Sequence, residues 1–98
     1  MRCLEFILGR RQAILEIAGR HGAKSVRIFG SVVRGQETAQ SDVDFLVTLD
    51  HDRSLIDHAA LMQDLEELLG CHVDVVNERA LHTHVRDRLL AEAIPLYH

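Results

Sequence analysis

The chain has 98 residues, of which 47% are hydrophobic and 27% are charged, and its formal net charge is −4. This length can build one core and is too short for two ordinary domains, so we expect a single domain over residues 1–98. The average composition argues against disorder, and no apolar run approaches the roughly 18 residues of a membrane span. The acidic balance argues against direct binding of nucleic acid, which relies on a basic face. The opening residues do not resemble a signal peptide, so we expect a cytoplasmic protein.

The first predicted elements are a helix and a strand. Apolar residues recur at steps of three and four from Leu4 to Ala18, which predicts one amphipathic helix. We expect this helix to end near Arg20, with Gly22 supplying the conformation needed beyond its end. Residues 25–29, SVRIF, alternate in the manner of a short strand.

A polar region then leads into a second strand. Residues 32–34 predict a short helical turn that Gly35 ends, and residues 36–41, QETAQS, predict a surface loop. The second strand is predicted at residues 43–49, VDFLVTL, where apolar residues predominate.

The second long helix has clear signals at both ends. Ser54 followed by Asp57 resembles a capping box, with aspartate in place of the usual glutamate. The apolar stripe then runs from Leu55 to Leu69, and Gly70 ends the helix.

The last part of the chain predicts a third strand, a helix and a tail. In CHVDVVN, residues 71–77, valines alternate with more polar residues. Asn77 is expected to cap a final helix that Pro95 ends, followed by a short tail at residues 96–98. This order of helices and strands indicates an α/β or α+β fold.

Three carboxylates stand out among the predicted strands. Asp42 and Asp44 open the second strand, and Asp74 lies within the third. If the strands are neighbours, the three side chains can meet on one face, where a divalent cation would offset their repulsion. Oxygen ligands favour Mg²⁺, and two such ions can assist an in-line phosphoryl displacement. Asp74 would then complete the ion that lowers the pKa of the attacking hydroxyl.

The Gly30-Ser31 pair supplies a complementary anion-binding element. Glycine lets backbone N–H groups approach phosphate oxygens, serine adds a hydroxyl donor, and Arg34 could neutralise charge on a triphosphate. Each feature alone has an ordinary structural explanation: a turn, a solvated strand end, or an exposed carboxylate at Asp74. Their joint occurrence favours a site for phosphate and metal.

At these residues the chain resembles a known superfamily. Gly30-Ser31, ten residues, and then Asp42-Val43-Asp44, with Arg34-Gly35 and Ser41 between, are similar to the signature of the DNA polymerase beta-type nucleotidyltransferases. Asp74 matches the third carboxylate of that superfamily. The short length and the ending Ala-Ile-Pro-Leu-Tyr further resemble the minimal nucleotidyltransferases, whose relatives serve as antitoxins to HEPN-domain ribonuclease toxins.

The resemblance implies a small mixed sheet with helices packed against it, and Mg²⁺-dependent transfer of AMP from ATP. It assigns Gly30 and Ser31 to the β- and γ-phosphates and groups Arg34 and Ser41 with them as nucleotide-binding residues. It further implies that Asp42 and Asp44 hold two Mg²⁺ ions, with Asp74 assisting the metal of the nucleophile. Many relatives have an arginine where this chain has Val32, which puts a secondary phosphate contact in doubt.

The implied acceptor is a tyrosine hydroxyl of a HEPN-domain toxin, with which the chain would form a hetero-oligomer; self-association stays open. Two alternatives also stay open. One is an antitoxin that neutralises its partner by contact alone. The other is a small-molecule nucleotidyltransferase of the aminoglycoside type, although such enzymes normally carry an additional substrate domain.

Overall fold

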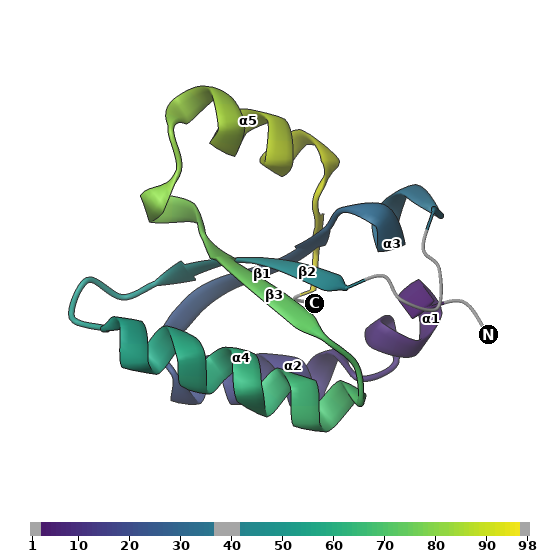
Figure 1. Cartoon of the computed structure of the whole chain (residues 1–98), viewed down its shortest axis with the longest axis horizontal. Helices are drawn as coiled ribbons and strands as arrows, with labels where there is room; N and C mark the ends of the chain where they lie inside the picture. The colour runs from purple at the N-terminus through teal and green to yellow at the C-terminus, as the bar shows by residue number, and fades with distance from the viewer. Residues whose placement is uncertain (1–2, 37–41, 97–98) are drawn as a thin grey trace.

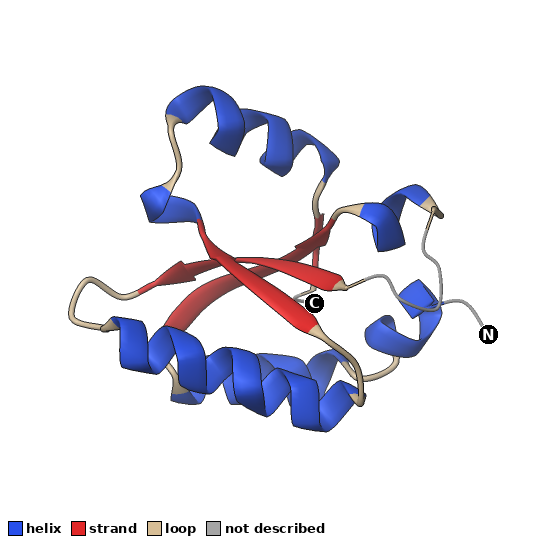
Figure 2. Ribbon diagram, in the orientation of Figure 1, coloured by secondary structure: helices blue, strands red, loops and turns tan. Residues whose placement is uncertain are grey.

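One four-stranded mixed sheet forms the centre of the molecule (Figure 2). The computed structural model describes residues 3–36 and 42–96. The strands lie in the order β3-β2-β1-β4, with β2 parallel to β3 and antiparallel to β1, which also pairs with β4 in antiparallel fashion. The expected small mixed sheet is confirmed. The strands are β1 Ala23–Phe29, β2 Val43–Leu49, β3 Val73–Asn77 and β4 Ile94–Pro95.

The helices lie on both sides of this sheet (Figure 1). α2 and α4 run side by side across one face, and α5 lies on the opposite side. The α-helices are α1 Cys3–Leu8, α2 Arg11–Arg20, α3 Ser31–Arg34, α4 Leu55–Leu69 and α5 Thr83–Glu92; a 3-10 helix, η1, spans Glu78–Ala80. Among residues 3–36 and 42–96, no helix is both long and apolar enough to span a membrane.

Alternation along β2 determines what each face of the sheet presents. Val43, Phe45 and Val47 are almost fully buried in the main core, which also contains residues of α2 and α4. Burial of a side chain such as Phe45 contributes about 1.5–3 kcal/mol. Since successive side chains of a strand point to opposite faces, Asp44 and Thr48 lie on the face opposite to α2 and α4. The core therefore fixes the orientation of the Asp44 side chain.

The helix α4 begins and ends as predicted. Ser54 Oγ accepts a hydrogen bond from the N–H of Ile56 (3.2 Å), and the Asp57 carboxylate accepts one from the N–H of Ser54 (2.9 Å). Gly70 then adopts the left-handed conformation with φ of 70°. One expectation is wrong: Leu55 and Ile56 do not belong to the buried stripe, because they are 84% and 80% exposed at the solvent end of the helix.

The single leading helix predicted from Leu4 to Arg20 is also wrong, because the chain forms α1 and α2 with a break between them. Gly9, which costs about 1 kcal/mol in a helix interior, lies at the break together with Arg10. The apolar stripe concealed the break, since Ile7 and Ile14 are buried on either side of it. The predicted end at Arg20 is confirmed.

The end of the chain differs from the expectation in two respects. Asn77 caps η1 and not the last helix: its side chain accepts a hydrogen bond from the N–H of Arg79. α5 begins later, after His82, which makes no side-chain cap. Ile94 and Pro95, expected at the end of that helix, instead form β4. Of the expected tail, Leu96 is 1% exposed, with its N–H bonded to the Val26 carbonyl (3.1 Å), and residues 97–98 lie outside the described residues.

Candidate active site

Two of the predicted carboxylates meet across the parallel strands. Asp44 and Asp74 are register partners in the β2/β3 ladder, so their side chains lie on the same face of the sheet. Asp42, two residues before Asp44, is exposed at the entrance to β2. Asp74 is exposed as well, whereas Asp44 is half-buried. The structure thus brings together Asp44 and Asp74 from segments thirty residues apart in the sequence.

Gly30 lies directly against the Asp44 carboxylate. It follows Phe29, the register partner of Asp44 in β1, and has a φ of 85° and a ψ of −155°, a conformation that only glycine adopts readily. A Cβ atom at Gly30 would lie 2.2 Å from Asp44 Oδ2. Because no side chain fits this space, glycine is required here by the carboxylate as well as by the backbone. Ser31 follows as the first residue of α3 and is half-buried.

Negative charge accumulates around Asp44. Burial raises the pKa of the Asp44 carboxyl above its ordinary value, and the neighbouring carboxylates of Asp74, Asp42 and Glu92 raise it further, while the Arg34 guanidinium acts in the opposite direction. Such a carboxyl is costly to ionise without a nearby cation.

Asp42, Asp44 and Asp74 match the donor chemistry of a magnesium site. The atoms that they could offer to a metal are all carboxylate oxygens, which select hard divalent cations. In the described segments 3–36 and 42–96, however, no three His, Cys, Asp or Glu side chains converge closely enough to hold an ion. To share a divalent cation, the side chains would have to turn toward one another at Asp42, Asp44 and Asp74. A bound cation would offset the repulsion between these carboxylates. The assignment of these three residues as ligands stays a prediction.

Arg34 lies at the same end of the sheet but is held by another side chain. Its guanidinium forms an ion pair with Glu92 Oε1 (2.5 Å) and donates through Nε to Gln36 Oε1 (3.1 Å). Glu92 Oε2 also accepts a hydrogen bond from the N–H of Gly30 (3.4 Å). Sequence reasoning missed Glu92, because one acidic residue on an exposed helix carries no distinguishing pattern. A surface pocket beside it is lined by Arg34, Glu92 and three further residues of α5: Val85, Arg88 and Leu89.

Two predicted features of the phosphate region have different outcomes. Ser41 lies outside the described residues. Val32, where the sequence put a secondary phosphate contact in doubt, is 2% exposed and packs in the core. Its apolar side chain has no donor to offer a phosphate.

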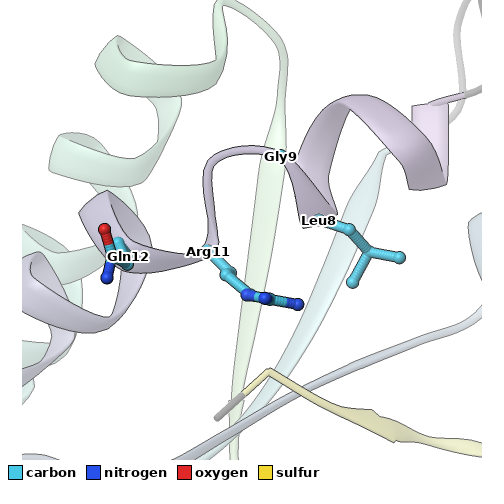
Figure 3. Close-up of a pocket in the computed structure, with 4 residues that line it drawn as sticks. All are labelled: Leu8, Gly9, Arg11 and Gln12. Carbon is cyan, nitrogen blue, oxygen red and sulfur yellow. The ribbon is translucent and has the colours of Figure 1, made fainter. Parts of the chain in front are cut away.

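A second pocket lies at the joint between α1 and α2 (Figure 3). Its lining consists of Leu8, Gly9, Arg11 and Gln12, and the side chains of Arg11 and Gln12 point in different directions. None of these is a predicted site residue and none is acidic, so this pocket carries none of the predicted chemistry.

A mixed sheet that brings aspartates together beside a Gly-Ser turn is the arrangement expected of a nucleotidyltransferase. The model of the nucleotidyltransferase domain family matches residues 10–96, and the chain belongs to this family. The prediction of a nucleotidyltransferase is confirmed.

Two similar proteins are named as protein adenylyltransferases. "Putative protein adenylyltransferase MJ0435" of Methanocaldococcus jannaschii is 39% identical over 84 residues, which cover 86% of this chain and 90% of that protein. Protein adenylyltransferase MntA of Thermococcus cleftensis is 37% identical over 79 residues, covering 81% of this chain and 80% of that protein.

Solved structures agree with the fold. One described as a "putative minimal nucleotidyltransferase" has a TM-score of 0.86 and 50% identity, and the match covers 94% of both chains. A chain from a tri-AMPylated Shewanella oneidensis HEPN toxin in complex with MNT antitoxin has a TM-score of 0.69 and 20% identity, covering 99% of this chain and 72% of that one. At this identity the second match shows the fold alone.

Proposed function

We propose that this chain is a protein adenylyltransferase that transfers AMP from ATP to a tyrosine hydroxyl of a HEPN-domain toxin and so acts as its antitoxin. The observation that carries the proposal is the alignment of Asp44 with Asp74 beside Gly30, whose Cβ position is filled by the Asp44 carboxylate. The names of the relatives support adenylyl transfer, and the HEPN complex of a protein with the same fold supports the choice of partner.

The residues divide between phosphate binding and metal binding. The N–H groups of the Gly30-Ser31 turn would bind the β- and γ-phosphates, and the Arg34 side chain would offset their charge. Asp42, Asp44 and Asp74 would hold two Mg²⁺ ions, which when bound lower the pKa of the attacking hydroxyl and offset charge on the leaving group.

In the proposed reaction the tyrosine oxygen forms a bond to the α-phosphorus of ATP. The bond from that phosphorus to the oxygen bridging to the β-phosphate breaks, pyrophosphate leaves, and the phenolic proton passes to solvent. Because ATP is the donor, we keep the cytoplasm as the expected compartment.

The test is incubation of the purified chain with α-labelled ATP, Mg²⁺ and the protein encoded next to it. We expect label on a tyrosine of that neighbour, and loss of at least about 99% of the transfer rate with Asp44→Asn, by analogy with the hundredfold losses seen on removing one charge-stabilising group. Asp52→Asn is the matched control, since it makes the same change at an exposed position outside the site. Absence of label on that neighbouring protein would contradict the proposal.

Neutralisation by contact alone is the second candidate. The exposure of the adjacent Leu55 and Ile56 favours it, because large apolar side chains in solvent often mark a contact surface. In that case Asp44→Asn would leave neutralisation intact, whereas Leu55→Ser with Ile56→Ser would abolish it.

A further inference from the structure

Glu92 contacts two groups that are proposed to bind the triphosphate: the Arg34 guanidinium and the N–H of Gly30. Its Oε1 forms the ion pair with Arg34, and its Oε2 accepts from the N–H of Gly30. These contacts join α5 to residues that lie 58 and 62 positions earlier in the chain. Glu92 thus connects the C-terminal helix to the candidate active site.

A carboxylate at this position resembles the ligand that the site is proposed to bind. Both a carboxylate and a phosphate present anionic oxygens to guanidinium and backbone N–H donors. The donors of Arg34 and Gly30 have limited capacity, so Glu92 and a triphosphate cannot both use them fully. Glu92 also adds to the negative charge beside Asp44, which further opposes an incoming polyanion.

The surroundings of Glu92 allow it to move away. α5 contains no buried residue, and the Glu92–Arg34 pair is partly exposed, with side-chain exposures of 24% and 49%. Arg88 lies one helical turn before Glu92 and lines the same pocket. It offers an alternative partner at i,i+4 spacing once Arg34 is released.

We propose that Glu92 is an internal competitor of the nucleotide, so that triphosphate binding requires Glu92 to release Arg34 and the N–H of Gly30. This rests on the proposed function. It goes beyond that function by coupling nucleotide binding to the position of α5.

The test is the affinity of the full chain for Mg²⁺ with a non-hydrolysable ATP analogue, measured by calorimetry. Glu92→Gln is expected to tighten binding about two- to fivefold, the range given by loss of a partly exposed ion pair. Glu16→Gln is the matched control, because it removes the same charge from an exposed pair with Arg20 on α2 and should leave the affinity unchanged. Thermal unfolding of each variant establishes that it is folded.

A double variant then identifies the donor involved. In an Arg34→Ala background, Glu92→Gln should gain much less affinity, because the competed group is gone. Equal or weaker binding by Glu92→Gln alone would overturn the inference and would favour a direct role of Glu92 in holding metal or nucleotide. If neither the wild-type chain nor the Glu92→Gln variant binds the analogue, both the proposed function and this inference fail. Binding by the Glu92→Gln variant but not by the wild-type chain would support competition between Glu92 and the nucleotide.

Discussion

Gly30 couples backbone conformation to the position of a carboxylate. Gly30→Ala would place a Cβ atom against Asp44 and force an unfavourable φ,ψ combination, which costs on the order of 1–3 kcal/mol. We expect a lower melting temperature together with loss of nucleotide transfer, measured by calorimetry and by labelled ATP.

Gly35→Ala separates these two effects. Gly35 also has a positive φ, of 72°, but apart from its chain neighbours no atom of the described residues 3–36 and 42–96 lies within 4 Å of its Cβ position. The Gly35→Ala variant should have a lower melting temperature but should retain most of the nucleotide-transfer activity. Equal loss of transfer in both variants would show that general strain, and not the contact with Asp44, is responsible.

Asp44 should make the metal-free protein less stable at neutral pH. Its pKa is raised in the folded state, so the folded protein binds this proton more tightly than the unfolded chain, and stability falls as pH rises through that pKa. Asp44→Asn is therefore expected to raise the melting temperature in the presence of a chelator at pH 7, with the advantage shrinking as pH falls toward the ordinary value of 3.8.

Thermal unfolding at pH 7 and at about pH 4, where an ordinary carboxyl is half-protonated, measures this effect. The exposed Asp52→Asn serves as the comparison. An Asp44→Asn protein no more stable than the wild type at pH 7 would contradict a raised pKa of the Asp44 carboxyl in the folded protein.

Among the elements, α4 has a cap that can be tested by one substitution. Ser54→Ala removes the side-chain acceptor of the capping box and should destabilise the fold by about 1 kcal/mol. Thr83→Ala, at the start of α5, is the control, because no side chain caps that helix. Chemical denaturation compares the two; an equal effect would mean that the cap contributes little.

Elements with local signals could be predicted from the sequence, and elements with distant partners could not. The bounds of β2 agree with the prediction at residues 43–49, and Gly70 ends α4 as expected. By contrast, β4 has only two residues and follows a helix directly, so its pairing with β1 leaves no trace in local periodicity. The break at Gly9 was masked because the apolar stripe continues across it.

At the scale of the whole molecule, the candidate site shows the same difference between residues with local sequence signals and residues with distant partners. Asp44 and Asp74 could be connected because each lies in a recognisable strand, and the parallel pairing then aligns them. Glu92 could not be found, since its contact with Gly30 depends on how α5 is carried back over the sheet. The roles assigned to all the site residues, Ser31 and Ser41 included, stay predictions.

The parallel register of β2 and β3 also determines which changes in chain length the molecule can tolerate. A residue added to the turn at 50–53 lengthens only a connection, and the ladder between Asp44 and Asp74 can remain as it is. A residue added within β3 before Asp74 would turn that carboxylate to the opposite face, into the apolar layer beneath α4. Natural and engineered variation in length should therefore concentrate in the connections and be absent from the few residues that precede each aspartate in its strand.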